Sequence, residues 1–322
     1  MEYITLKGSK QKVSRISLGT MNIVSRHVDE NGNKSYSGKS VEEVEELIKG
    51  ALDLGINLID TADIYGHGLS EKLIGEVIKR NPGIREKMLI QTKCGVVSTE
   101  EERNYNFDGD YIIQCVNASL ERLRTDYIDI FLLHKPDPLY DPGDIGQAFE
   151  RLYEEGKVLN FGVCNLTSMQ TALIQKHCKR PIAVSQVQLS MVHTLLIDST
   201  LNCNTNSEFG IDRDSGLMDY CRLKDIRMEA YSIAVPVPHK GTFIDNPEYA
   251  ELNAVMDRLC EKYHTNKNAL TVAWILRHPA GIIPTIGTTK LSRVKDSLDA
   301  LNYTLTRQEW YDLYLAANHP LW

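Results

Sequence analysis

Short apolar runs alternate with longer amphipathic runs along nearly the whole chain, and this alternation limits the fold more than any other feature. The pattern is typical of repeated strand–helix units around a parallel sheet. Strands are expected near residues 16–20, 57–60, 88–93, 128–133, 159–163, 183–188, 227–232 and 282–286. Helices are expected near residues 41–54, 69–80, 110–124, 144–156, 215–224, 247–264, 267–278 and 290–301. Eight strands in series are the number of a (β/α)8 barrel, so we predict the α/β class and a TIM barrel.

Both ends of the chain carry additions to this pattern. Residues 3–6 and 11–13 flank a Lys-Gly-Ser-Lys turn and predict an N-terminal β-hairpin that plugs the bottom of the barrel. After Thr306 we expect a C-terminal helix with its apolar residues on one side: Trp310, Leu313 and Tyr314. No proline-rich linker or break in composition divides the 322 residues, so we expect a single domain spanning residues 1–322.

Composition and charge narrow the class of partner. The chain has 43 acidic and 36 basic residues, a net charge of −7 and a pI near 5.8. These values argue against nucleic acid or an anionic membrane, so we expect a small-molecule substrate. The start lacks an apolar stretch long enough for a signal peptide and no later run could span a bilayer, which predicts a cytoplasmic protein. Seven cysteines without a C-x-x-C pair favour reduced thiols. The sequence leaves the oligomeric state open.

Four residues with reactive side chains stand at or just after the carboxyl ends of predicted strands. Asp60 and Lys93 each end a strand, and His134 follows the next one. Tyr65 lies five residues beyond Asp60, on a loop that can fold back over the barrel mouth. Because barrel enzymes keep their chemistry at this end, we expect an acid, a cation, a phenol and an imidazole to converge on one point.

Each of these four residues also has a purely structural interpretation. Tyr65 could be a loop aromatic, Asp60 and Lys93 a structural ion pair, and His134 a satisfied core histidine. Jointly these interpretations are less attractive, because four polar side chains would then be desolvated without a purpose. A metal site is not predicted, since the H-x-E, H-E-x-x-H and C-x-x-C spacings are absent.

A set of motifs occurs in a fixed order along the chain: Asp60-Thr61-Ala62-Asp63-Ile64-Tyr65-Gly66 with Ser70-Glu71, then Thr92-Lys93, Leu132-Leu133-His134 and Phe161-Gly162-Val163-Cys164-Asn165. This ordered set resembles the aldo-keto reductase family over nearly the whole chain. The chain is particularly similar to bacterial YdhF-type oxidoreductases, through Lys93-Cys94-Gly95, His134-Lys135-Pro136-Asp137-Pro138 and Ile286-Gly287-Thr288-Thr289. Any one motif is weak evidence, whereas the ordered set is strong.

The resemblance implies reduction of an aldehyde or ketone to an alcohol by hydride transfer from a nicotinamide. The developing alkoxide needs a proton, and Tyr65 is the general acid that we choose, provided that the pKa of its phenol is lowered. Lys93, as a nearby cation, would lower that pKa, and Asp60 would fix the position of Lys93. His134 would orient the carbonyl through a hydrogen bond, as a neutral imidazole.

The cofactor prediction rests on the last strand and the helix after it. There is no G-x-G-x-x-G motif, so a Rossmann site is not indicated. Barrel enzymes instead bind phosphates at the loops after strands seven and eight and at a helix N-terminus. Such a site is offered by Gly287, which permits close backbone approach, by the hydroxyls of Thr288 and Thr289, and by the charges of Lys290 and Arg293. The alternative is a solvated helix N-terminus with chance cations.

The resemblance also implies roles for single residues. Arg293 would bind the adenosine 2′-phosphate, which implies NADP rather than NAD, and Asp296 would lie near the adenine. Asn165 and Gln186 would hold the nicotinamide carboxamide, with the Tyr231 ring beneath it. The remaining cofactor contacts that we expect are Gly19, Thr20, Asp60, Ser232 and Ile286. As alternatives, Tyr231 could serve packing and Gln186 could be a buried amide.

The chain departs from the family pattern at three places. Cys164 stands where serine is usual and Ser297 where asparagine is usual. The segment Ile233-Ala234-Val235-Pro236-Val237-Pro238 replaces a glycine-containing loop that holds the pyrophosphate in relatives.

The function that these observations favour is an NADP-dependent aldo-keto reductase acting on a small carbonyl substrate. The unusual segment at residues 233–238 motivates a second hypothesis, a dinucleotide-binding barrel that acts as a sensor or partner subunit with little turnover. A third is a barrel hydrolase or lyase in which Asp60 and Lys93 do acid–base work. The sequence does not name the substrate.

Overall fold

The computed structural model describes residues 1–30, 34–99, 101–203, 205–236 and 241–321. Within these ranges, eight parallel strands close into a barrel in chain order, each paired with the next and the last with the first. They are β3 (Ser17–Gly19), β6 (Leu58–Asp60), β7 (Leu89–Cys94), β10 (Ile128–Leu133), β11 (Val158–Cys164), β12 (Ile182–Gln188), β13 (Arg227–Tyr231) and β14 (Ile283–Ile286). The predicted TIM barrel of the α/β class is confirmed.

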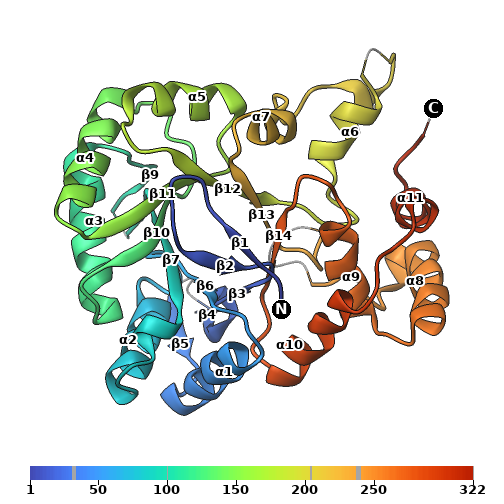
Figure 1. Cartoon of the computed structure of the whole chain (residues 1–322), viewed down its shortest axis with the longest axis horizontal. Helices are drawn as coiled ribbons and strands as arrows, with labels where there is room; N and C mark the ends of the chain where they lie inside the picture. Colours follow the sequence, from blue (N-terminus) through green and yellow to red (C-terminus); the bar gives the residue numbers. More distant parts are fainter. Residues whose placement is uncertain (31–33, 100, 204, 237–240, 322) are drawn as a thin grey trace.

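Helices form a ring outside the strands (Figure 1). They are α1 (Val41–Asp53), α2 (Leu69–Arg80), α3 (Gly109–Leu123), α4 (Pro142–Glu154), α5 (Ser168–His177), α6 (Leu195–Leu201), α7 (Leu217–Leu223), α8 (Ala250–Tyr263), α9 (Lys267–Leu276), α10 (Leu291–Leu298) and α11 (Arg307–Ala316). Local sequence explains where several begin. At α1, for example, Ser40 and Glu43 form a capping box in which each side chain accepts a hydrogen bond from the backbone of the other.

The sequence patterns missed two of these helices, α5 and α6. Helix α5 has no clean apolar face, since Met169 and Leu173 are 73% and 43% exposed, so its periodicity is weak. Its N-terminal capping box, Thr167 with Gln170, was the available signal. Helix α6 is only seven residues long, too short for a periodic pattern to stand out.

The N-terminal hairpin forms as predicted, from β1 (Tyr3–Thr5) and β2 (Lys12–Ser14) paired antiparallel. It lies across the end of the barrel that faces the viewer in Figure 1. Leu6 and Val13 are buried in one apolar cluster with side chains from the barrel strands, among them Leu58, Ile130 and Ile283. The hairpin therefore seals the bottom of the barrel and leaves the opposite end for the site.

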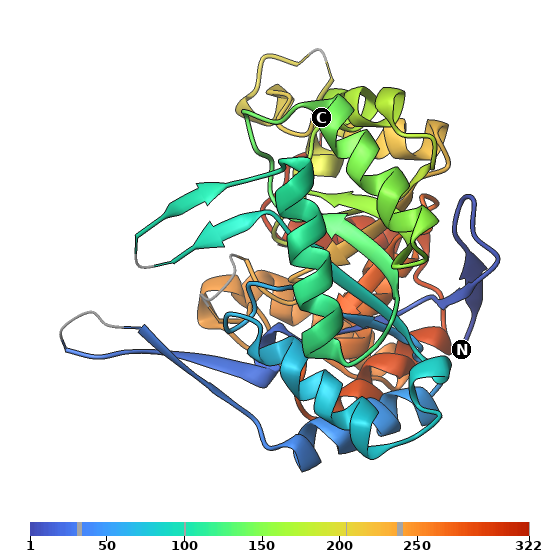
Figure 2. The same ribbon diagram turned by 90° about the vertical axis from the view of Figure 1, so that its left-hand side faces the viewer.

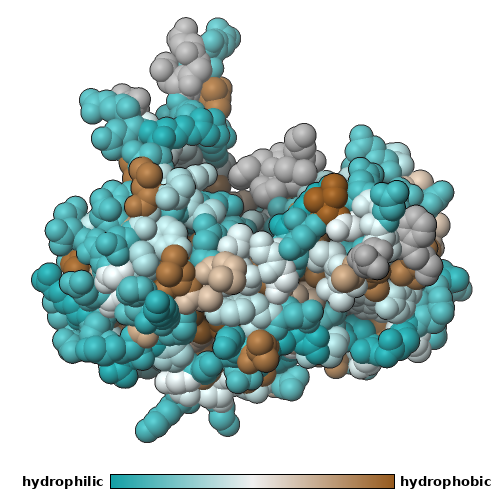
Figure 3. Space-filling model, turned by 90° about the horizontal axis from the view of Figure 1, so that it is seen from above, coloured by the Kyte–Doolittle hydropathy of each residue, from teal (hydrophilic) through white to brown (hydrophobic). Residues whose placement is uncertain are grey.

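Two further hairpins, not predicted from the sequence, rise at that opposite end. One is β4 (Val24–Val28) with β5 (Lys34–Gly38), and the other is β8 (Val96–Ser98) with β9 (Arg103–Tyr105). Figure 2 shows both projecting from the body on the side away from the N-terminal hairpin. Seen from above, the projecting part is covered mainly by hydrophilic residues (Figure 3). The second hairpin occupies the connection between β7 and α3.

The C-terminal helix α11 packs on the barrel through the predicted side chains. Trp310, Leu313 and Tyr314 are all buried. The Trp310 ring stacks on Trp274 of α9 at a centroid distance of 5.0 Å, and each indole N–H donates to the backbone carbonyl of the other tryptophan. Among the helices described, none is long and apolar enough to cross a membrane.

Candidate active site

Asp60, Lys93 and Tyr65 form a connected chain at the mouth of the barrel. Asp60 is the last residue of β6, and Lys93 lies near the end of the neighbouring β7. The Lys93 ammonium donates to Asp60 Oδ1 at 2.7 Å and to the Thr61 carbonyl at 2.8 Å, and it lies 3.4 Å from the Tyr65 hydroxyl. Asp60 and Lys93 are 3% and 0% exposed, so this ion pair is desolvated. The loop after β6 brings Tyr65 back over the pair, as expected.

Burial and neighbouring charges shift the pKa values of Lys93 and Tyr65 in opposite directions. Burial is the largest single effect and disfavours the ammonium of Lys93, but the charge and hydrogen bond of Asp60 together with the nearby Tyr65 and Cys164 outweigh it and raise the lysine pKa, which keeps Lys93 charged. Burial raises the pKa of Tyr65 to about 12, and the charge of Lys93 offsets only part of that rise. The predicted net lowering of the tyrosine pKa is therefore wrong, because desolvation dominates. The phenol keeps its proton at neutral pH.

His134 completes the group of four. It follows β10 directly, and its ring lies edge-on to the Tyr65 ring at a centroid distance of 6.0 Å. Burial and the nearby positive charges of Lys93 and Lys135 hold the imidazole pKa well below its usual value, so the ring is neutral. Its Nδ1 is buried without a hydrogen-bond partner among the described residues. The four predicted catalytic residues thus meet at one place.

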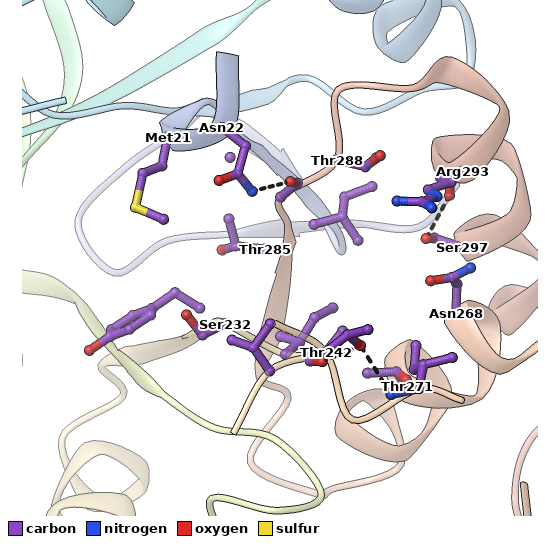
Figure 4. A pocket seen from close by; sticks show the side chains of 18 of the residues that line it. Met21, Asn22, Ser232, Thr242, Asn268, Thr271, Thr285, Thr288, Arg293 and Ser297 are labelled. Carbon is purple, nitrogen blue, oxygen red and sulfur yellow. Dashed lines mark hydrogen bonds between the residues drawn. The ribbon is translucent and has the colours of Figure 1, made fainter. Parts of the chain in front are cut away.

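A cavity of about 620 Å³ opens beside this group and runs toward β14 and α10. Asp60 and Tyr65 line one part of it, and Thr288 and Arg293 line another. Figure 4 shows Arg293, Ser297 and Asn268 together at one end of this cavity, with Met21 and Ser232 further along it. The volume falls within the range of small-molecule and cofactor sites.

The cavity brings together only part of the predicted cofactor residues. Those that line it are Gly19, Asp60, Tyr231, Ser232, Ile286, Gly287, Thr288 and Arg293. Those that do not line it are Thr20, Asn165, Gln186, Thr289, Lys290 and Asp296. Thr20 is buried and its hydroxyl donates to the carbonyl of Asp60, so it stabilises the end of β6. Lys290 precedes α10 and is exposed.

The end of the cavity near α10 contains an exposed cation, Arg293, and a glycine, Gly287, whose backbone lies close to Asn22. Arg293 is exposed, and its guanidinium makes no ion pair with any residue that the structure describes. Asn22 donates to the Gly287 carbonyl at 2.6 Å, and a Cβ on Gly287 would lie 3.3 Å from the Asn22 amide nitrogen. The sequence analysis missed Asn22, Thr242, Asn268 and Thr271, which also line the cavity and carry no motif.

Tyr231 and Asn165 are linked beside the cavity. The Tyr231 hydroxyl donates to Asn165 Oδ1 at 2.8 Å, and Asn165 Nδ2 in turn lies 3.0 Å from Cys164 Sγ. Burial raises the pKa of the Cys164 thiol to about 12, so this residue, which replaces the usual serine, remains a neutral thiol. Tyr231 lines the cavity.

Gln186 does not face the cavity but joins a buried polar network inside the barrel. Its Nε2 donates to Asp60 Oδ1 at 2.9 Å and to Glu229 Oε2 at 2.9 Å. Gln91 Nε2 makes the same two contacts, at 2.8 and 2.6 Å. The sequence analysis missed Gln91 and Glu229; the available signal was a polar residue inside each of two apolar strands.

The atypical segment after β13 bends at Ser232, whose φ of 55° is in the left-handed region. The backbone N–H of Val235 then donates to the Ser232 carbonyl, and Ala234 and Val235 reach the cavity. Val237 and Pro238 of this segment lie outside the described residues. The described part of this segment offers apolar side chains to the cavity.

Comparison with known proteins agrees with this geometry. Residues 15–314 match the model of the aldo/keto reductase family. Oxidoreductase YdhF of Escherichia coli is 34% identical over 284 residues, covering 86% of this chain and 88% of the relative. A 6-dehydroglucose reductase of Agrobacterium fabrum is 32% identical, covering 86% and 89%. The chain therefore belongs to the aldo/keto reductase family and is an oxidoreductase.

The names of two more distant proteins state different cofactors. The crystal structure of a Bombyx mori aldo-keto reductase in complex with NADP superimposes with a TM-score of 0.70 at 22% identity, covering 99% of this chain and 94% of that one. An NADH-specific methylglyoxal reductase of Escherichia coli is 26% identical, covering 95% of each chain. Family membership alone thus leaves the choice between NADP and NAD to the site.

Proposed function

We propose that this chain is a single-domain, NADP-dependent reductase of a small aldehyde or ketone, working in the cytoplasm. The observation that carries the proposal is the buried Asp60–Lys93–Tyr65 chain at the wall of a cavity whose far end holds Arg293, which makes no ion pair with the residues that the structure describes. Structural ion pairs in proteins do not need a phenol beside them or a cavity in front of them.

The residues present fit a dinucleotide phosphate. The cavity is long enough to reach from Tyr65 to Arg293, and between them lie backbone at Gly287 and the Thr288 hydroxyl. When bound, reduced NADP supplies the hydride for the carbonyl carbon. Arg293 is the residue that favours NADP over NAD, because a guanidinium binds a phosphate through charge-assisted hydrogen bonds that a ribose hydroxyl cannot match.

Tyr65 carries the proton in this proposal. Its pKa of about 12 keeps the phenol protonated at neutral pH, so the acid is available before the reaction starts. The Lys93 ammonium, 3.4 Å from the hydroxyl, stabilises the negative charge that forms on Tyr65 as the proton leaves. Asp60 holds Lys93 in place, and the neutral His134 offers a hydrogen bond to the substrate oxygen. No step requires a metal.

The second hypothesis from the sequence, a dinucleotide-binding sensor with little turnover, rests on the apolar segment after Ser232. A loop without the usual glycines could hold the pyrophosphate differently and slow cofactor exchange. The two hypotheses share the cofactor and differ in turnover.

Two measurements test the proposal together. Fluorescence titration with NADPH and NADH gives the two affinities, and cofactor oxidation with a panel of aldehydes, ketones and sugar-derived carbonyls gives turnover. The proposal expects tighter NADPH binding and measurable reduction of at least one carbonyl. Binding without turnover over the whole panel would favour the sensor, and tighter NADH binding would overturn the NADP assignment.

A further inference from the structure

The polar network behind the site crosses the inside of the barrel. Asp60 and Gln91 face each other on the adjacent strands β6 and β7, and Gln186 and Glu229 face each other on β12 and β13. The two pairs come from opposite sides of the closed barrel. Their contacts span the interior at a level where TIM barrels usually pack branched apolar residues. A polar layer here carries a desolvation cost that packing alone does not explain.

The two glutamines tie the two carboxyl groups together. Each amide nitrogen has two protons, and each uses one toward Asp60 Oδ1 and one toward Glu229 Oε2. Asp60 Oδ1 also accepts from Lys93, so the same oxygen receives three donors. Any change in charge at Glu229 therefore acts directly on the two amides that orient Asp60.

Charge is not balanced in this network when every group is ionised. The titratable groups that face Glu229 are Asp60 on β6, Lys93 on β7 and the neutral Cys164 on β11, while its neighbour on β14, Ile283, carries no charge. Two buried carboxylates would then share one ammonium. Glu229 is fully buried, and its second oxygen, Oε1, has no hydrogen-bond donor among the described residues. A buried carboxylate oxygen without a donor is the place where a proton is most favourable.

We propose that Glu229 is a positioning residue that holds a proton while the site donates one from Tyr65, and that its ionisation tightens the hold of Tyr65 on its proton through Gln91, Gln186, Asp60 and Lys93. The chemical change at Glu229 is the gain or loss of one proton, which it exchanges with solvent. No bond other than this O–H bond is made or broken. Glu229 does not line the cavity, so it acts through Asp60 and not on the substrate.

The electrostatics of the site agree with this geometry. Burial and the neighbouring Asp60 raise the pKa of Glu229 to about 7, although the two glutamine hydrogen bonds work in the other direction. Glu229 thus changes charge near neutral pH, well below the pKa of Tyr65. An added negative charge makes the phenol a weaker acid, so carbonyl reduction should slow as Glu229 ionises.

The experiment compares the wild type with Glu229→Gln, which keeps an oxygen for both amides and removes the titration. Infrared spectra recorded across neutral pH, with and without 13C-labelled glutamate, report the carbonyl stretch of a protonated glutamate. We expect a band that disappears as pH rises through neutrality in the wild type and is missing in Glu229→Gln. Absence of such a band in the wild type would overturn the proposal, even if the variant failed to fold.

The kinetic arm rests on the proposed reductase function. Turnover of the wild type should fall several-fold as pH rises through neutrality, and Glu229→Gln should lack this step while keeping the later alkaline limb of Tyr65. An unchanged step in the variant would overturn the coupling to Tyr65. If the wild type reduced no carbonyl with either cofactor, the proposed function would fail, and the infrared arm would still decide whether Glu229 holds a proton.

Discussion

Replacing Lys93 by methionine removes the cation that the described residues place in the buried network, and it keeps an unbranched side chain that is one atom shorter. The structure predicts a large loss of stability, because Asp60 and Glu229 are then left inside the barrel with no positive charge. Removing one partner of a buried ion pair costs about 3 to 5 kcal/mol. The contact to the Thr61 carbonyl is lost as well, while the donors from Gln91 and Gln186 remain, so we expect a value near the lower end of that range.

The chain offers a matched control at its surface. Lys39 pairs with Glu43 at 2.6 Å, four residues apart on an exposed helix end. Lys39→Met should cost far less, since exposed pairs are screened by water. Urea unfolding followed by circular dichroism gives both free energies. A double variant, Asp60→Asn with Lys93→Met, should recover part of the loss because it removes both charges. A loss for Lys93→Met no larger than that for Lys39→Met would refute the reasoning.

Three other predictions concern the cofactor, pH and packing. Arg293→Ala should weaken NADPH binding by about 1 to 3 kcal/mol and barely change NADH binding in titrations with both, whereas equal losses would assign Arg293 to a shared phosphate or to the fold. The pKa of Glu229 is raised from 4.5 to about 7, so its stabilising contribution is complete below about pH 4.5 and is lost as pH rises through about 7, a change of roughly 3 kcal/mol. Unfolding measured across that window should show this decline in the wild type and not in Glu229→Gln; parallel curves would contradict it. Gly75→Ala should destabilise the fold by about 1 to 3 kcal/mol in the same assay, because the new Cβ would lie 2.1 Å from the Arg122 carbonyl of α3, and an unchanged free energy would show that α2 and α3 can separate.

The sequence predicted the barrel because its strands and helices have different periods. All eight barrel strands and most of the helices lie where the patterns placed them. The failures have physical causes. Helix α5 exposes Met169 and Leu173, so it shows no amphipathic stripe. The hairpins β4–β5 and β8–β9 stand away from the body and bury little, so no hydrophobic alternation marks them.

The features of the site also fall into those that the sequence predicted and those that it did not. Asp60, Lys93, Tyr65 and His134 could be brought together from sequence, because strand ends in a barrel meet at one mouth. The sign of the Tyr65 pKa change could not, because it depends on how deeply the hydroxyl is buried relative to Lys93. The roles of Glu229 and Gln91 could not be predicted either. Their contact joins opposite walls of the barrel, and neither strand alone shows which of its residues will lie at the same level as a residue of the other.

The central claim is that Tyr65 donates the proton in an NADPH-dependent reduction. Single-turnover and steady-state rates of Tyr65→Phe, measured together with its NADPH affinity, test this most directly. Phenylalanine keeps the ring and loses only the hydroxyl that lies 3.4 Å from Lys93. Loss of nearly all carbonyl reduction with NADPH affinity within a few fold of wild type is the predicted result. Reduction close to the wild-type rate in Tyr65→Phe would contradict the account.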